Sequence, residues 1–299
     1  MLNQIKGAAL ALLLATCSTP AIADGDGPAT VRLFPRTHID GRLTGGLSGL
    51  EWHRETNTLI ALSDRGDLYR MPMQADKDMI RIGRIKLPRR LNDPEALRRG
   101  PGDRWIVSFE QGGGIAWYEG AAEGLLIQPT RELRPKAIRA LPQNAGIEAL
   151  AVLDFGRLLV IAEGGSGDLR KAWIIDDAIL DAREYPVSDG FEPVDAAELP
   201  NGDLLILERR FNGLVPPFFS TRVAYIAATV LDKDEPIIAE SRTSLESVVA
   251  SENWEGIALA EDQGSMLIWL VSDDNQKWPQ NTLLAKISLA DFMALKTGR

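Results

Sequence analysis

The sequence predicts an all-β fold, a β-propeller in which five blades are favoured and six are the alternative. One observation is that the same hairpin-like pattern occurs five times, with Ser48, Glu95, Glu148, Asp195 and Glu255 at equivalent positions. The intervals between these residues are 47, 53, 47 and 60 positions, which is the spacing of repeated supersecondary units. The other observation is that the strands of these repeats are apolar on both sides, as face-to-face packing of propeller blades requires.

Each repeat is predicted to form two strands joined by a tight turn. The five segments are 46–66, 93–111, 146–165, 193–210 and 254–274. Their centres contain turn sequences such as PNGD and LDFGR, and Asn-Gly is a strong signal of a hairpin turn. The flanking runs LLVIAE, LLILE and WIVSFE lack the alternation of apolar and polar residues, so these strands are expected to be buried on both faces.

Further strand-like segments lie between the repeats. GGIAWYEG, KAWIIDD, TRVAYIAATVL and NTLLAKISL contain many residues that favour strands, so each interval has room for about four strands. The segment ATVRLFPRTHI precedes the first repeat and NTLLAKISL follows the last. Pairing these N- and C-terminal strands in one blade would close the ring and remove its sheet edges. The 60-residue interval leaves room for a sixth blade, and the rival architecture is a two-sheet sandwich.

Residues 1–23 are expected to be a secretory signal peptide, followed by a single domain over 24–299. Lys6 precedes the apolar run GAALALLLA, and small residues stand at Ala21 and Ala23, which is the layout of a segment cleaved before Asp24. Cys17 offers the alternative of a lipid anchor. The apolar run is too short for a transmembrane span. We therefore expect a periplasmic or secreted protein without a transmembrane segment, with a lipoprotein attached through Cys17 as the alternative.

The composition of the chain limits which partners and which types of metal or catalytic site are expected. The formal net charge is −9 at pH 7, which disfavours nucleic acid and anionic membranes as partners and favours cations. The chain has one cysteine and two histidines, His38 and His53, so a thiolate or polyhistidine zinc site is not expected. The sequence contains no nucleophile elbow, P-loop or dinucleotide-binding signature. We expect a monomer that acts on a small-molecule substrate.

The repeats place acidic residues where the strands of each hairpin begin and end. The opening acids are Glu95, Glu148, Asp195 and Glu255, and the closing acids are Asp64, Glu110, Glu163, Glu208 and Asp273. Because the first and last residues of an antiparallel hairpin are neighbours, these carboxylates are expected to lie on one face of the ring. They would then hold a hard cation such as Ca²⁺, which takes six to eight oxygen ligands. The alternative is a structural role for each acid, through ion pairs with basic residues in the same tips.

The units GLSGLEW…TLIALSDRG, GIEALAVL…LLVIAEG, DAAELPNGDLLILERRF and NWEGIALAED…WLVSDDN are similar to the phytase-like family, described by the esterase-like activity of phytase. The resemblance covers roughly residues 40 to 290. It implies an exported bacterial β-propeller that hydrolyses phosphate esters or other esters.

Under this resemblance, the leading hypothesis is Ca²⁺-assisted hydrolysis of a phosphorylated small molecule. The expected metal ligands are Glu110, Glu148, Glu163, Glu255, Asp273 and Asp274. The expected catalytic residues are Glu148, Glu255 and Asp273. The expected phosphate-binding residues are Arg65, Arg209, Arg210 and Lys277. Two alternatives stay open: a Ca²⁺-dependent lactonase or carboxylesterase, and a non-catalytic envelope propeller that binds a ligand or partner.

Overall fold

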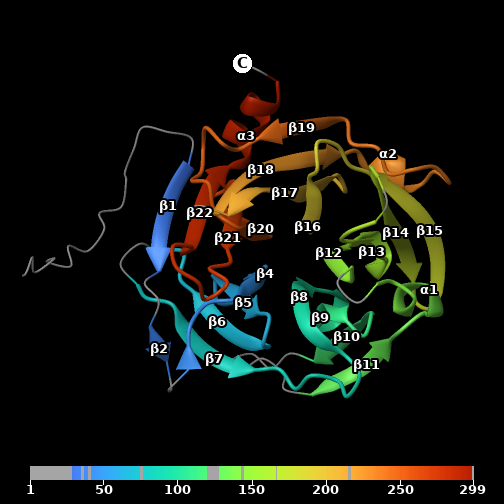
Figure 1. The fold of residues 1–299 in the computed structure, drawn as a ribbon, viewed down its shortest axis with the longest axis horizontal. Coiled ribbons are helices and arrows are strands. Elements are labelled where there is room, and N and C mark those ends of the chain that lie inside the picture. The colour runs from blue at the N-terminus through green and yellow to red at the C-terminus, as the bar shows by residue number, and fades with distance from the viewer. Residues whose placement is uncertain are drawn as a thin grey trace, which may run out of the picture.

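The computed structural model describes residues 29–34, 37–39, 42–74, 77–119, 128–142, 145–165, 167–214 and 217–297. Within these residues, five four-stranded antiparallel sheets stand around a central axis, and each contributes one strand to the inner wall of the ring (Figure 1). The fold is a five-bladed β-propeller, which confirms the favoured prediction. The expected signal peptide and Cys17 lie outside the described residues.

The first four blades follow one another along the chain, each running from an inner to an outer strand. The first contains β4 (Leu47–His53), β5 (Thr58–Ser63), β6 (Asp67–Met71) and β7 (Ile80–Arg84). The second contains β8 (Asn92–Arg99), β9 (Arg104–Gln111), β10 (Gly114–Glu119) and β11 (Pro129–Leu133). The third contains β12 (Ile147–Val152), β13 (Leu158–Ala162), β14 (Leu169–Asp176) and β15 (Ile179–Pro186). The fourth contains β16 (Glu192–Glu198), β17 (Leu204–Leu214), β18 (Pro217–Ile226) and β19 (Ser241–Ser244).

The fifth blade joins the two ends of the chain. It contains β20 (Trp254–Asp262), β21 (Ser265–Ser272), β22 (Thr282–Ser288) and, as its outermost strand, β1 (Ala29–Phe34). β1 pairs with β22 from Ala29 opposite Ile287 to Phe34 opposite Thr282, so the N- and C-terminal strands close the ring as predicted. The short elements are β2 (His38–Ile39), β3 (Arg42–Leu43), α1 (Lys136–Arg139), α2 (Ala228–Leu231) and α3 (Leu289–Lys296). None of the helices in the described part of the chain is long and apolar enough to cross a membrane.

Hydrophobic residues fill the spaces between neighbouring blades. Along β5, Leu59 and Ala61 pack against the fifth blade, and the alternate residues Ile60 and Leu62 pack against the second blade. Because successive side chains of a strand point to opposite faces, a strand between two blades is apolar at every position. This packing explains the uninterrupted apolar runs of the repeats. Each fully buried leucine contributes roughly 1.5–3 kcal/mol.

The axis of the ring is filled by a buried ion pair. Arg98 on β8 contacts Asp195 on β16, with 2.5 Å between Nη2 and Oδ1, and both side chains are almost inaccessible to solvent. The guanidinium also donates hydrogen bonds to one backbone carbonyl of every inner strand: Leu50, Leu97, Leu150, Ala196 and Ile257. Asp195 accepts the backbone N–H of Ile257 at 2.9 Å. The pair therefore ties all five blades together at the axis.

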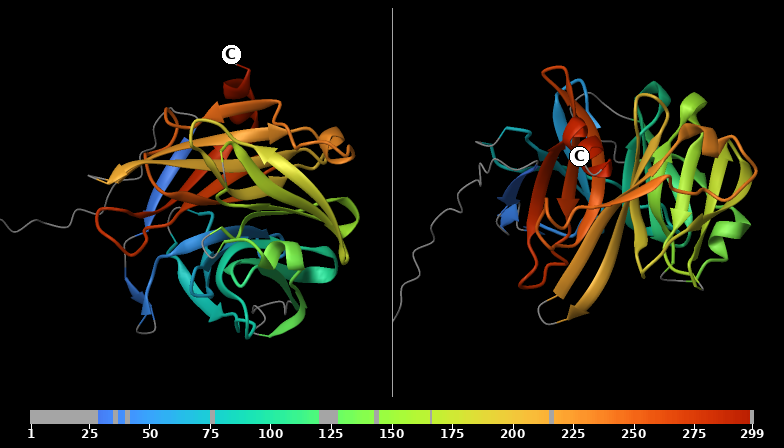
Figure 2. Two further views of the ribbon diagram at one scale, coloured as in Figure 1. Left: turned by 45° about the vertical axis from the view of Figure 1, so that its right-hand side comes forward. Right: turned by 90° about the horizontal axis from the view of Figure 1, so that it is seen from above.

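The inner strands all run in the same direction, which gives the ring two different mouths. We call the end at which β4, β8, β12, β16 and β20 begin the acidic mouth, because the closing acids lie there. We call the other end, where these strands enter the hairpin turns, the turn mouth. Figure 2 shows that the hairpin of β17 and β18 projects beyond the ring. With 11 and 10 residues, these two strands are the longest in the described part of the chain.

Candidate metal centre at the acidic mouth

Irregular pairing at the starts of the inner strands positions the opening acids. Glu148 is the extra residue of a β-bulge between β12 and β13. Glu255 has the same place between β20 and β21, and Ser48 has it in the first blade. Glu95 lies where the pairing of β8 with β9 is interrupted. Because a bulge turns a side chain out of the regular alternation, these residues face the mouth instead of a neighbouring blade.

The closing acids stand opposite these bulges in four blades, at Asp64, Glu110, Glu163 and Asp273. Opening and closing acids therefore form one cluster around the acidic mouth. Two groups within it have carboxylate oxygens that lie within 4.8 Å of one another: Asp93 with Glu95 and Glu110, and Glu110 with Glu148 and Glu163. Glu110 belongs to both groups, so two neighbouring cation sites would share this residue.

Arg209 is the basic residue inside this cluster. It donates hydrogen bonds to Glu255 and Asn253, and its Nη2 lies 3.4 Å from Glu163. Asn253 also donates to Glu255 at 2.7 Å. Arg209 therefore neutralises the side of the mouth formed by the fourth and fifth blades. Asp93, Glu95, Glu110 and Glu148, from the second and third blades, have no ion pair among the described residues.

Burial and mutual repulsion make these carboxyl groups weak acids. Burial, with the charge of Asp93 beside it, raises the pKa of Glu110 to about 7. Burial and Glu148 raise the pKa of Glu95 well above its usual range, and burial and Glu163 do the same for the pKa of Glu148. A cation placed among these carboxyl groups would favour their ionised forms, because an opposite charge lowers the pKa of an acid.

The pH dependence of stability tests this electrostatic arrangement. Burial raises the folded-state pKa of Glu110 to about 7, from an ordinary value of 4.5, and the folded protein therefore binds more protons than the unfolded chain between these values. The free energy of unfolding of the metal-free protein should then fall as pH rises from about 4.5 through about 7. Asp64, Asp195 and Glu198 have pKa values raised in the same direction, to about 6, 7 and 7. Urea unfolding with a chelator at pH 5, 6, 7 and 8 measures the effect, and stability that rises across this range would contradict it.

The fourth blade departs from the predicted repeat by one residue. Pro193 pairs with Glu208, and Val194 takes the bulge position that Glu148 and Glu255 hold in other blades. Arg209, one residue later, therefore stands where the other blades have a closing acid. A shift of one residue along a strand moves every side chain to the opposite face. The expectation that Asp195 and Glu208 face the acidic mouth is wrong for this reason.

Both displaced acids have structural roles. Asp195 pairs with Arg98 at the axis. Glu208 is completely buried between the third and fourth blades, where it accepts hydrogen bonds from Tyr185, Arg222 and Arg242. For these two residues, the alternative of structural ion pairing applies.

The other expected phosphate-binding residues lie in different surroundings. Arg65 lies at the acidic mouth, with its Nε 3.7 Å from Asp64 and its Nη2 donating to the carbonyl of Gly45 at 3.1 Å. Arg210 points away from Arg209 and packs over the ring of Phe191, 4.8 Å from its centroid. The backbone N–H of Lys277 donates to the carbonyl of Asp274 at 2.8 Å. Arg65, through Asp64, and Arg209, through Glu163 and Glu255, contact carboxylates of the acidic mouth.

The adjacent aspartates Asp273 and Asp274 differ in environment. Burial and the charge of Glu255 raise the pKa of Asp273 well above its usual range. The Asp274 carboxylate instead accepts the backbone N–H groups of Gly46 at 3.2 Å and Gln276 at 2.9 Å. Asp273 therefore belongs to the cluster, whereas Asp274 holds the loop at Gly46 in place. Its assignment as a metal ligand stays a prediction.

The donor set fits a hard cation. The two groups that share Glu110 offer only carboxylate oxygens, and oxygen ligands are those preferred by Ca²⁺. Asp93, Glu95, Glu110, Glu148 and Glu163 are the residues that would hold such an ion. Sequence reasoning missed Asp93, which stands two positions before Glu95 in the second repeat, and it missed Arg98, which is one of two adjacent arginines at the end of β8.

Comparison with known families now bears on this site. Residues 42–276 match the family described as phytase-like, esterase-like activity of phytase. The chain belongs to the phytase-like family. The match includes all five inner strands and the closing acids at Asp64, Glu110, Glu163 and Asp273. A search of curated proteins gives no significant match.

Solved structures similar to this phytase-like protein have low sequence identity to it. The exo-1,5-α-L-arabinanase from a bovine ruminal metagenomic library is 11% identical, with a TM-score of 0.54, over 85% of this chain and 96% of that one. The glutaminyl cyclase of Myxococcus xanthus is 15% identical, with a TM-score of 0.48, over 87% of this chain and 97% of that one. A luciferin-regenerating enzyme is 13% identical, with a TM-score of 0.45, over 81% and 91%. The first of these supports the propeller architecture.

Proposed function

We propose that this phytase-like protein hydrolyses phosphate esters at the acidic mouth, with divalent cations bound there and Ca²⁺ as the expected metal. The observation that supports this most is the pair of carboxylate groups that share Glu110, each with oxygens within 4.8 Å of one another. Their negative charge lacks a basic partner among the described residues on the side of the second and third blades. Uncompensated charge in a partly buried site is costly, and a divalent cation would remove that cost.

The surrounding residues suit phosphate ester hydrolysis. A bound Ca²⁺ would neutralise phosphate oxygens and favour ionisation of a water molecule. Glu255 is held in place by Arg209 and Asn253, so its carboxylate is oriented to accept a proton from the attacking water. Burial and the charge of Glu255 raise the pKa of Asp273 well above its usual range, which favours the protonated form that would donate to the leaving alcohol.

The two arginines of the mouth would have different roles. Arg209 already donates to Glu255, Asn253 and Glu163, so it is a positioning residue for Glu255. The Arg65 guanidinium lies at the rim and is about one-third exposed, at 36%. We assign Arg65 the contact with phosphate oxygens, for which arginine provides two parallel donors.

The test is calorimetric titration of Ca²⁺ into chelator-treated protein, followed by assays with p-nitrophenyl phosphate, inositol hexakisphosphate, p-nitrophenyl acetate and a γ-lactone. We expect saturable Ca²⁺ binding and Ca²⁺-dependent release of inorganic phosphate. Arg65→Ala should reduce this rate at least about tenfold, since a charge-assisted hydrogen bond is worth about 1.5–3 kcal/mol. Turnover of only the acetate or lactone would favour the esterase or lactonase alternative, and Ca²⁺ binding without turnover would favour the non-catalytic one.

A further inference from the structure

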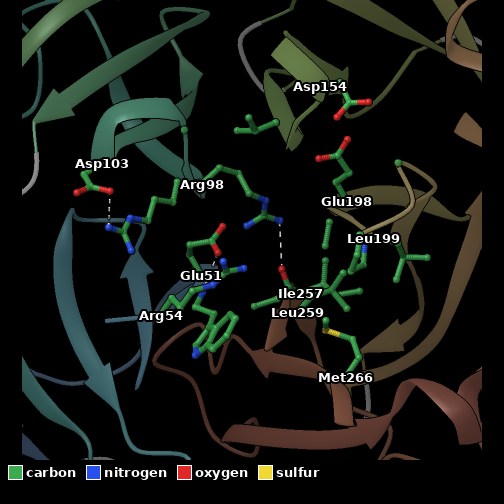
Figure 3. Close-up of a pocket in the computed structure, with 18 of the residues that line it drawn as sticks. Glu51, Arg54, Arg98, Asp103, Asp154, Glu198, Leu199, Ile257, Leu259 and Met266 are labelled. Atoms are coloured by element: carbon green, nitrogen blue, oxygen red, sulfur yellow. Dashed lines mark hydrogen bonds and ion pairs between the residues drawn. The ribbon is translucent and has the colours of Figure 1, made fainter. Parts of the chain in front are cut away.

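A cavity of about 500 Å³ opens at the turn mouth, on the opposite side of the ring from the carboxylate cluster. It is formed by the ends of the inner strands and the hairpin turns that follow them (Figure 3). The Arg98–Asp195 pair lies between this cavity and the acidic mouth, since Arg98 lines its inner end. The cavity is therefore a separate site, and its volume falls in the range of small-molecule pockets.

One side of the cavity is apolar. The apolar side chains that line the cavity include Val152, Ala197, Leu199, Ile257, Leu259 and Met266. Figure 3 shows Leu199, Ile257, Leu259 and Met266 grouped on one side. Met266 is an adaptable side chain that packs against ligands of different shapes. This surface would contact the hydrocarbon part of a ligand.

On the first- and second-blade side of the cavity, Arg99 is paired with two acids, whereas Arg54 has no ion pair among the described residues. Arg99 donates hydrogen bonds to Glu55 and to Asp103, with 2.7 Å to the latter. The Arg54 guanidinium lies over the ring of Trp52, 5.1 Å from its centroid. The two carboxylates neutralise Arg99, and the exposed Arg54 keeps its positive charge on this side of the cavity.

The side of the cavity formed by the third and fourth blades carries two carboxylates without an ion pair among the described residues. Glu198 and Asp154 both line the cavity, and Figure 3 shows their carboxylates close together. Neither has an ion pair in the part of the chain that the structure describes. Burial and the charge of Asp154 raise the pKa of Glu198 to about 7. Glu51 adds a third carboxylate, which accepts the backbone N–H of Trp52 at 2.9 Å.

We propose that this cavity binds a small organic cation, with its ammonium or amidinium group between Glu198 and Asp154 and its apolar body against Leu199, Leu259 and Met266. The cation would relieve the repulsion between the two carboxylates. An anion of the same shape would meet that repulsion, and a neutral ligand would leave the carboxylates without a counter-charge. The site is independent of the phosphate ester hydrolysis proposed for the acidic mouth.

The test uses four probes of similar size that differ in charge: phenethylamine, benzamidine, 2-phenylethanol and 3-phenylpropionate. Binding to the purified protein is measured by calorimetry at pH 8, where Glu198 is ionised. We expect at least one of the two cations to bind with a Kd below about 1 mM. The alcohol should bind at least about tenfold more weakly, and the carboxylate more weakly still.

Two variants locate the binding. Glu198→Gln removes the charge with little change of shape and should weaken cation binding about tenfold or more. Glu184→Gln is the matched control, because Glu184 is an exposed residue of the outer strand β15 and lies outside the cavity. Equal melting temperatures of the two variants show that both fold. The proposal is overturned if the alcohol binds as tightly as the amine, if neither cation binds below about 10 mM, or if both variants bind the cation equally.

Discussion

Replacing Glu110 by glutamine is expected to weaken divalent-cation binding at the acidic mouth at least about 100-fold. Glu110 is the carboxylate common to both groups of candidate ligands, so its loss removes a ligand from each. Replacement of even an outer partner of a metal ligand costs 10–100-fold in affinity, and loss of a direct ligand should cost at least as much. Ca²⁺-dependent phosphate release should fall with it. Calorimetric titration of Ca²⁺ into Glu110→Gln and wild type measures the change.

The same substitution should raise the stability of the metal-free protein above pH 7. Wild-type Glu110 is ionised there against an unfavourable environment, because burial and Asp93 raise its pKa to about 7, whereas glutamine stays neutral. A variant that binds Ca²⁺ poorly and melts higher in chelator at pH 8 cannot have lost binding through misfolding. The control is Glu184→Gln, which should match wild type in both measurements. Unchanged Ca²⁺ affinity in Glu110→Gln would remove the acidic mouth as the metal centre.

Replacing Arg98 by methionine is expected to destabilise the fold by about 3–5 kcal/mol, as breaking a buried ion pair does. The variant leaves Asp195 buried without its counter-charge and removes the donor shared by the inner-strand carbonyls. For a domain of this size each kcal/mol lowers the melting temperature by about 2–4 °C, so a fall on the order of 10 °C should be seen by calorimetry.

A double substitution separates the charge from the packing. Arg98→Met with Asp195→Leu replaces both charges by apolar side chains of similar volume, and such replacements of buried pairs are often neutral or stabilising. We expect the double variant to melt above Arg98→Met. If the single variant melted within about 2 °C of wild type, the pair would not hold the blades together.

The fold could be predicted because each blade repeats the same local rule. Apolar runs such as LLVIAE pack against both neighbouring blades, so the pattern that identified the strands is the pattern that stabilises them. The number of blades followed from five recognisable hairpins, and the 60-residue interval proved to contain long strands of the fourth blade instead of a sixth blade.

The site could be predicted only where the repeat was regular. Glu148 and Glu255 occupy equivalent bulges, and their shared position in the pattern indicated their shared location. In the fourth blade the bulge is at Val194. The sequence alone does not reveal this shift of one residue, because PVDAAE aligns equally well with the corresponding segments of the other blades. The sequence therefore predicts a substrate-binding role for Arg209 beside the ring of acids, and the structure places Arg209 at a closing-acid position within that ring.

The pairing of β1 with β22 has a consequence for synthesis of the protein. Ala29 and its partner Ile287 lie 287 − 29 = 258 positions apart, so β1 leaves the ribosome long before β22. A nascent chain that ends before Thr282 exposes the free edges of both β1 and β21, and such edges recruit other chains or chaperones. Synthesis of β22 is thus the step that completes the fifth sheet, because β22 covers the edges of β1 and β21 that face each other across it.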